Sequence, residues 1–341
     1  IYEMTQIKGD SETHPLLSPD DAWADFGTWD KGDLGGRNRI TPEMLPHQYA
    51  RSALRLGLGH EANLGTNPFK FGMIGSTDAH TTLATTREDN FFGKNPPAEP
   101  DMNRWSHVFM KGELEGTDYY NWETLASGLT GVWARENTRE AIFDAMNRKE
   151  VYATTGSRIT VRVFGGWDFE ADEVERPDFA ERGYSSGVPM GGDLMNAPDG
   201  KAPVMMIRAL RDPDNANLDR VQVVTGWLNA DGTTSEKVYD AACSDGRTIM
   251  DHACDGDVGN TVDVANATYT NTIGDPMLTS VWTDPDFDPA QRAFYYVRVL
   301  EIPKPTWQAH DAAYYGVEMD PEVPMVPQDR AYTSPIWYTP G

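Results

Sequence analysis

Long apolar segments are absent from this 341-residue chain, and so is any excess of positive charge. No apolar run approaches the roughly 20 residues that a membrane-spanning helix requires, so we expect no membrane span. The formal net charge is −24, because 53 acidic residues outnumber 29 basic ones. Such a charge repels phosphate backbones and anionic lipids, which argues against nucleic-acid binding. A small anionic substrate stays compatible, since one bound cation inverts the local potential.

Cysteine is almost as scarce, since Cys243 and Cys254 are the only two in the chain. The turn-rich segment between them allows a disulfide and equally allows two unrelated thiols, because sequence does not establish pairing geometry. A disulfide that closes so short a loop stabilises by up to about 3 kcal/mol in the chain-entropy model. It also indicates an oxidising compartment, and on that reading we expect a periplasmic or secreted protein.

The chain also lacks an initiator methionine and a signal-peptide pattern, since it opens with I-Y-E-M-T-Q-I, which alternates like a strand. We therefore expect the natural protein to extend before Ile1. The composition is that of a folded protein, with 39% hydrophobic and 24% charged residues and with 10 tryptophans. A length of 341 residues is enough for two domains.

The hydrophobic pattern changes near residue 158. Before it, strand-like segments at 1–7, 128–134 and 151–154 are interspersed with helical ones; Thr41-Pro42-Glu43 predicts a helix start, and Gly57 and Gly59 predict its end. After it, alternating segments predict strands at 159–164, 204–210, 220–225 and 293–300, separated by Asp, Pro, Gly and Asn clusters. We predict an α/β part over residues 1–157 and an all-β part, resembling a sandwich, over residues 158–341.

The stretch F-K-F-G-M-I-G-S-T-D-A-H, residues 69–80, gives the clearest chemical signal. An apolar strand delivers Asp78 and His80 with one residue between them, and side chains at i and i+2 of an extended segment point to the same side. A carboxylate and an imidazole together suit zinc, manganese or iron better than calcium. The pair therefore predicts a divalent transition-metal site, although a turn aspartate followed by a surface histidine gives the same pattern.

A second polar cluster follows the first strand: Glu3, Lys8, Glu12 and His14. Carboxylates and a histidine ligate metals or transfer protons, and a lysine offsets the charge of a phosphate or carboxylate. The alternative is an ordinary polar junction between a strand and a loop.

The long polar segment 81–121 contains Arg87 and a Phe91-Phe92-Gly93 sequence among charged residues, including Lys94. Loops of this length in a compact domain are often functional, so a lid over a site is one interpretation. A surface loop anchored by a small apolar plug is the other.

Two other classes of function have sequence support. Gly183-Tyr184-Ser185-Ser186-Gly187 matches the G-x-S-x-G motif of serine hydrolases, yet a charged stretch precedes it and we expect a plain loop. A non-catalytic protein that binds carbohydrate or a partner through exposed aromatics is the second alternative; the tryptophans concerned are Trp167, Trp227, Trp282, Trp307 and Trp337. Core packing explains the same tryptophans.

Several motifs in order resemble a bacterial family catalogued as a domain of unknown function and related to the PHP (polymerase and histidinol phosphatase) metallohydrolases. The segments that carry this resemblance are K-G-D-S-E-T-H-P, N-P-F-K-F-G-M-I-G-S-T-D-A-H, R-E-D-N-F-F-G-K, V-Y-A-T-T-G-S-R-I-T-V-R and S-P-I-W-Y-T-P. The resemblance implies that residues 1–157 are the C-terminal part of a distorted PHP-like (β/α)7 barrel and that residues 158–341 form an accessory β-sandwich-like domain.

The resemblance also implies a metal cluster with an H-x-H pair on the first barrel strand and a final D-x-H, which Asp78 and His80 match. No two histidines here have the H-x-H spacing, so the missing N-terminal half of the same protein is an expected partner. Glu3 and His14 match positions near the site and are expected as further ligands. Lys8, Glu12 and Arg87 are expected to assist catalysis. The implied activity is metal-dependent hydrolysis of a small-molecule ester, most simply a phosphoester, by a metal-activated water.

Overall fold

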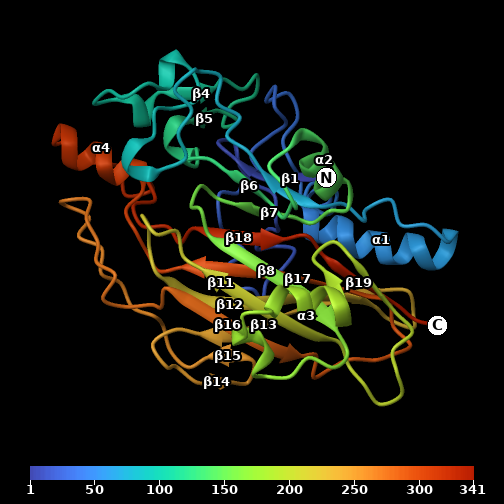
Figure 1. Cartoon of the computed structure of the whole chain (residues 1–341). Coiled ribbons are helices and arrows are strands. Elements are labelled where there is room, and N and C mark those ends of the chain that lie inside the picture. The colour runs from blue at the N-terminus through green and yellow to red at the C-terminus, as the bar shows by residue number, and fades with distance from the viewer.

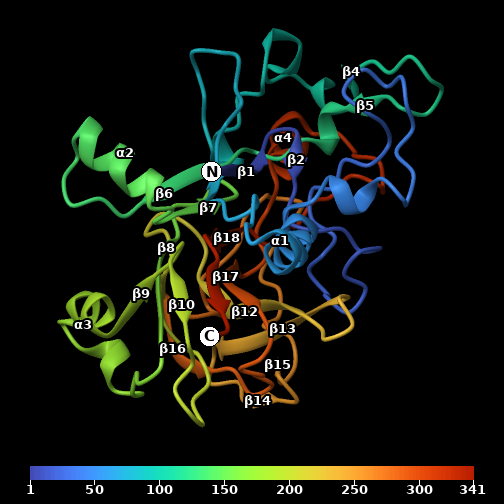
Figure 2. The same cartoon turned by 90° about the vertical axis from the view of Figure 1, so that its right-hand side faces the viewer.

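The computed structural model describes all residues from Ile1 to Gly341 as a β-rich α/β protein with four α-helices and several sheets (Figures 1 and 2). The helices are α1 (Ala50–Leu64), α2 (Arg139–Asn147), α3 (Phe179–Ser186) and α4 (Trp307–Tyr315). The strands of the first half are β1 (Tyr2–Gln6), β2 (Gly9–Asp10), β3 (Met73–Gly75), β4 (Val108–Met110), β5 (Tyr119–Tyr120), β6 (Leu129–Val132), β7 (Val151–Thr154) and β8 (Thr160–Gly166). The later strands are β9 (Gly187–Pro189), β10 (Asp193–Met195), β11 (Val204–Leu210), β12 (Leu218–Leu228), β13 (Thr234–Cys243), β14 (Ile249–Met250), β15 (Ala253–Cys254), β16 (Met277–Thr283), β17 (Ala293–Glu301), β18 (Arg330–Thr333) and β19 (Ile336–Thr339).

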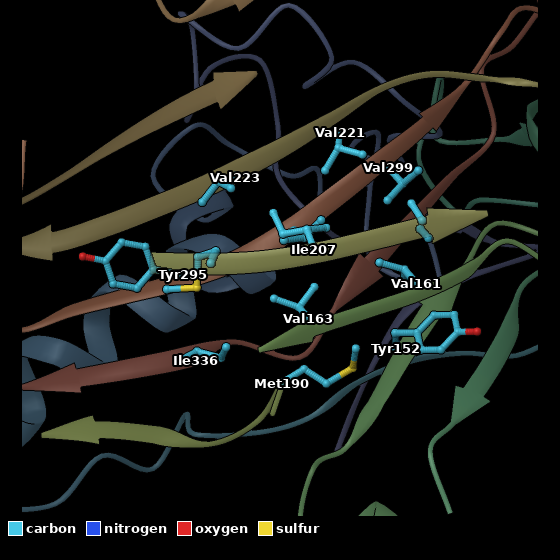
Figure 3. Close-up of a cluster of buried hydrophobic side chains, with 14 of the residues drawn as sticks. Tyr152, Val161, Val163, Met190, Ile207, Val221, Val223, Tyr295, Val299 and Ile336 are labelled. Atoms are coloured by element: carbon cyan, nitrogen blue, oxygen red, sulfur yellow. The ribbon is translucent and has the colours of Figure 1, made fainter. Parts of the chain in front are cut away.

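Two packed sheets form the main core. An eight-stranded sheet has the order β10-β19-β17-β18-β7-β6, with β12 joined to β17 and β13 to β12, and a four-stranded sheet has the order β16-β11-β8-β9. Their facing side chains form one apolar cluster, in which Val161 and Ile207 of the smaller sheet pack with Val223 and Val299 of the larger one (Figure 3). The period-two alternation of these strands produces this arrangement, because alternate residues point to the shared interior.

The opposite face of the eight-stranded sheet is covered by α1 and the first strands. Leu54 and Leu58 of α1 pack with Val224, Phe294 and other buried residues of that sheet. A small open sheet lies on this side, with the order β2-β1-β3, in which β1 and β3 are parallel. Figure 1 shows β1, β4, β5 and α4 at the end of the molecule away from β14 and β15.

The sheets are open, and no closed barrel is present. Instead of a ring of parallel strands, the first 157 residues contribute the three-stranded sheet, the two-stranded sheet of β4 and β5, and two strands, β6 and β7, of the eight-stranded sheet. Strand β7 pairs with β18, so backbone hydrogen bonds connect the two parts that the sequence pattern separates at residue 157. The boundary itself stays a prediction.

Helix α1 differs from its sequence prediction at both ends. Residues 45–47 form only a short 3-10 turn after Pro42, and the α-helix begins at Ala50. Neither Gly57 nor Gly59 ends it; the helix continues to Leu64 and is closed by Gly65 in the left-handed conformation, with φ 73°. Gly57 serves packing, because a Cβ there would lie 2.3 Å from the side-chain oxygen of Asn67.

Residues 183–187 also differ from the expected loop. They form the end of α3 and the start of β9. A nucleophile elbow needs a strand before the serine and a helix after it, and this order is reversed here.

A disulfide joins Cys243 at the end of β13 to Cys254 of β15, with 5.9 Å between their Cα atoms. This bridge is consistent with an extracellular, oxidising environment. None of the helices combines the length and the apolar composition that crossing a bilayer demands.

Candidate functional site

Strand β3 positions the predicted metal-binding pair. It pairs with β1 and passes close to β6 and β7, and Gly75 permits that approach because a Cβ there would lie 2.8 Å from the carbonyl oxygen of Leu129. The chain leaves the strand at Ser76 and reaches Asp78, whose φ of 50° lies in the left-handed region. Aspartate tolerates this region better than most residues do.

Asp78 and His80 do converge, although not through an extended backbone. His80 Nε2 lies 3.1 Å from Asp78 Oδ1, and the His80 side chain is 64% exposed while that of Asp78 is 20% exposed. From the sequence we expect an extended strand to place both side chains on one side. The turn at Asp78 brings them together instead. Both donor atoms are thus adjacent at the surface of a polar loop.

Two lysines converge on the same carboxylate. Lys94 Nζ lies 2.6 Å from Asp78 Oδ2 and 3.2 Å from His80 Nε2, and Lys8 Nζ pairs with the same Oδ2 atom. The backbone N–H of His80 also donates to the carbonyl oxygen of Lys94, at 2.7 Å. Sequence reasoning placed Lys94 in the polar loop but gave it no role in the site.

Glu3 joins this group from β1. The hydroxyl of Ser76 donates to Glu3 Oε1, and Gln6 Nε2 donates to Glu3 Oε2 at 3.0 Å. The parallel register pairs Glu3 with Ile74 and Thr5 with Gly75, so Glu3 lies beside the strand that leads into Ser76. Glu3, Ser76, Asp78, His80, Lys8 and Lys94 are hereafter the Asp78 cluster.

Burial lowers the pKa of both ammonium groups. Desolvation, and after it the adjacent Lys94 ammonium, lowers the pKa of Lys8 to about 8. Desolvation also lowers the pKa of Lys94, while its contact with Lys8 and the Glu3 carboxylate oppose the shift. The cluster therefore contains one lysine that titrates close to neutral pH.

Glu12 lies elsewhere, in a buried ion network. Its carboxylate accepts hydrogen bonds from Arg51 at 2.6 Å, from Arg298 at 3.0 Å and from the Tyr296 hydroxyl at 2.6 Å. Asp21 completes the network by pairing with both arginines. No hydrogen bond or ion pair joins Glu12 to Asp78, so its predicted proton-transfer role stays a prediction, whereas its part in neutralising two buried arginines is evident.

His14 and Arg87 are also apart from the Asp78 cluster. His14 Nε2 lies 3.1 Å from Asp30 Oδ2, and the ring packs against Tyr49. Arg87 forms a two-point ion pair with Asp89, at 2.8 and 2.5 Å, and lines a different polar cavity of about 300 Å³ together with Lys304. Neither residue forms a hydrogen bond or an ion pair with Asp78. The ligand role of His14 and the catalytic role of Arg87 stay predictions.

Phe91, the first of the two adjacent phenylalanines in the polar loop, is a buried apolar anchor. This residue is 6% exposed and packs with Ile7, Ala126 and Trp307, its ring centroid 5.3 Å from that of Trp307. Of the two interpretations of the loop, this contact favours the anchored one. The anchor fixes the path that leads to Lys94.

The features behind the alternative functions have structural explanations. Trp307 and Trp337 are buried, and Trp167, Trp227 and Trp282 pack partly against the main core. The Ser185 hydroxyl donates to the carbonyl oxygen of Arg182 at 3.1 Å, and no histidine hydrogen-bonds to it. Core packing thus accounts for the tryptophans, and the serine lacks a base.

One group of histidine, cysteine and acidic side chains has three candidate ligand atoms within 4.8 Å of one another: Asp240, Cys243 and Cys254. Both cysteines are oxidised to the disulfide, so they offer no thiolate. Asp240 is itself bonded to Arg220 and Gln222, each at 2.8 Å. This group does not suit a metal in the disulfide form.

The Asp78–His80 pair fits a metal better in its chemistry. Ligand–metal bonds of about 2.0–2.2 Å place neighbouring nitrogen and oxygen donors roughly 3 Å apart, as they are here. Two ligands are one fewer than a catalytic zinc site takes from its protein. The pair is therefore compatible with part of a metal shell. Lys8 and Lys94 pair with the Asp78 carboxylate of this shell.

These observations define a β-rich α/β protein with an Asp/His/Lys cluster at the end of a short parallel strand. The chain belongs to DUF3604, a family described as proteins of unknown function, whose family model matches residues 1–340. Comparisons with curated proteins and with solved structures find no match.

Proposed function

We propose that this protein is a metal-dependent hydrolase of small phosphoesters or related esters, and that the Asp78 cluster is its reaction site. The observation that carries the proposal is the convergence of one carboxylate, one imidazole and two ammonium groups from three separate segments. Hydrolysis needs a site for a cation and groups that stabilise negative charge on the ester, and these residue types supply both. The resemblance of D-x-H to the PHP hydrolases supports the same chemistry.

The Asp78 carboxylate and the His80 imidazole would hold a zinc, manganese or iron ion. Such an ion, when bound, lowers the pKa of a water molecule and supplies the hydroxide nucleophile. These two ligands are fewer than a catalytic metal takes from its protein, so the shell needs further ligands. His14 and Glu3 are weaker candidates, since His14 is paired with Asp30 and Glu3 with Ser76.

The chain's own cations have a defined task in this scheme. When Asp78 turns to a cation, Lys8 and Lys94 lose their carboxylate partner and are available for the anionic oxygens of the ester. The net reaction consumes one water: its hydroxyl joins the phosphorus, the phosphorus–oxygen bond to the alcohol breaks, and the alcohol oxygen takes the proton. A periplasmic or secreted location is proposed from the disulfide.

Metal content of a point variant tests the proposal. We expect the purified protein to retain a divalent transition metal, measured by elemental analysis, and Asp78→Ala to lose it together with any phosphatase activity. The control is Asp231→Ala, which removes an aspartate from an exposed turn outside the cluster. Equal metal content in wild type and Asp78→Ala, with both folded by circular dichroism, contradicts the assignment.

A further inference from the structure

A cavity of about 400 Å³ opens beside the Asp78 cluster, and two members of the cluster, Glu3 and Lys8, line it. Its size is within the range of small-molecule sites. The cavity lies between the β1–β2 turn and the loop that follows residue 28, and it also meets β5.

Part of the lining of this cavity is apolar and is called the apolar wall here, although Asp33, Asn38 and Gln48 also line the cavity. Trp29, Leu34, Met44 and Tyr119 all line it. Leu34 is 72% exposed and Met44 is 43% exposed, so large apolar side chains face solvent at the cavity in a protein with a formal net charge of −24. Apolar surface gathered at a concave site indicates a ligand that covers it.

The aromatic part of this wall is held rigidly. Trp29 stacks on Tyr119 with 4.3 Å between ring centroids and an interplanar angle of 14°, and its indole N–H donates to the carbonyl oxygen of Glu123 at 2.8 Å. The Tyr119 hydroxyl accepts hydrogen bonds from the backbone N–H groups of Lys31 and Gly32. Fixed rings bind an apolar group without the entropic cost of ordering them.

Gly9 brings this wall next to Lys8. A Cβ at Gly9 would lie 3.0 Å from Cδ1 of Trp29 and 2.4 Å from the carbonyl oxygen of Gly27, and its φ of 102° is a conformation that favours glycine. The indole therefore contacts the backbone one residue after the lysine. Lys8 and Trp29 thus line the same cavity, with the indole against the residue that follows the lysine.

We propose that this cavity is the subsite for the alcohol portion of the substrate, and that the substrate is an ester whose alcohol carries a flat apolar ring, with its phosphate directed to Lys8. This inference rests on the proposed function for the placement of the phosphate. The apolar wall itself is independent of any metal or any reaction. A purely polar alcohol leaves Leu34 and Met44 uncovered.

Two phosphonates that resist hydrolysis test the subsite by binding alone. Phenylphosphonate and methylphosphonate share the anionic group and differ in the ring. Isothermal titration calorimetry on the full chain is expected to give phenylphosphonate at least tenfold higher affinity. Leu34→Ser is expected to reduce that preference several-fold, and Leu64→Ser, which changes a leucine 71% exposed at the end of α1, is expected to leave it unchanged.

The outcomes separate this inference from the proposed function. Equal affinities for the two phosphonates, a preference that Leu34→Ser does not alter, or hydrolysis of phosphate esters by a chain that binds neither phosphonate overturns the subsite. A chain that binds phenylphosphonate in a Leu34-dependent way but hydrolyses no ester with added zinc or manganese keeps the subsite and loses the hydrolase assignment.

Discussion

Lys8 is the side chain whose protonation controls the charge of the Asp78 cluster near neutral pH. Burial and the neighbouring Lys94 lower its pKa to about 8, so the ammonium is present below pH 8 and is lost as the pH rises above it. Each pH unit above the pKa reduces the charged fraction about tenfold. Anion binding that depends on Lys8 must weaken over the same range.

We predict that phenylphosphonate affinity falls about tenfold between pH 7 and pH 9 in wild type, beyond any change that the ligand's own titration causes. Lys8→Arg is the reference, because an arginine keeps its charge throughout this range. The ratio of the two dissociation constants, measured by calorimetry across the series, isolates the lysine. A ratio that does not change with pH contradicts the lowered pKa.

Lys94 shows why part of the site escapes sequence analysis. Asp78 and His80 are neighbours in the chain, so a local pattern indicates their contact. The contact between Lys94 and Asp78 spans 16 residues of a loop without periodicity. It depends on the anchoring of Phe91 against Trp307, a long-range packing contact that no local pattern encodes.

Helix α4 is attached to the same loop through a half-buried carboxylate. Glu88 Oε2 accepts a hydrogen bond from the N–H of Trp307 at 2.5 Å, in the first turn of the helix that Thr306 caps. Nearby, Lys304 pairs with Glu301 at 3.1 Å and with Asp329 at 2.6 Å. Two carboxylates thus pair with one ammonium, and the nearby Glu88 carboxylate adds to the negative charge around it.

Desolvation raises the pKa of Glu88 to about 8, with Asp329 adding to the shift, and desolvation raises that of Glu301 to about 7. Both values lie above the ordinary range near 4.3, so the folded state holds these protons more tightly than the unfolded state does. The stabilisation that they provide is complete at low pH and is lost as the pH rises through 7 and 8.

We predict that the free energy of unfolding, measured with urea, falls by roughly 4 kcal/mol between pH 6 and pH 8.5. Glu301→Gln should remove about a third of this dependence, because the amide does not titrate and Glu88 supplies the larger share. Glu140→Gln, which changes an exposed residue of α2, is the control. Parallel pH profiles for wild type and Glu301→Gln would exclude Glu301 as a source; Asp10, whose pKa burial raises to about 7, would then be examined next.

Strands were easier to predict than helix ends, for a physical reason. Alternate residues of β8, β11, β12 and β17 point into the main core, and β12 and β17 are buried on both faces, so these segments are marked by recurring apolar residues. The start of α1 is set by packing and not by local sequence chemistry. Thr41 and Pro42 have the chemistry of a helix start, but packing against the eight-stranded sheet selects Ala50, Leu54 and Leu58 as the buried face.

The sequence pattern divides the whole molecule into two parts at residue 157. The contacts in the structure join these two parts closely. Hydrogen bonds between β7 and β18 cross the predicted boundary at residue 157. The network of Glu12, Asp21 and Arg51 with Arg298 connects the first 51 residues to β17. These contacts join residues that are hundreds of positions apart in the sequence. The periodicity of a segment carries no information about such distant partners.

The Arg298 network yields the prediction for the intact chain. Arg298 is fully buried, and its guanidinium bonds to Asp21 at 2.7 Å, to Glu12 at 3.0 Å and to Gln222 at 2.8 Å. Replacing it with leucine leaves Glu12 and Asp21 to share Arg51, and removing one partner of a buried ion pair costs about 3–5 kcal/mol.

We therefore expect Arg298→Leu to lower the free energy of unfolding by about 3–5 kcal/mol in urea titrations followed by tryptophan fluorescence and by circular dichroism. Arg37→Leu breaks the exposed pair with Glu113 and should cost less than about 1 kcal/mol. Because the network joins residues before 52 to β17, Arg298→Leu should unfold in one transition with the same midpoint by both probes. Midpoints that differ between the two probes would show that the chain does not unfold as one unit despite the shared sheet.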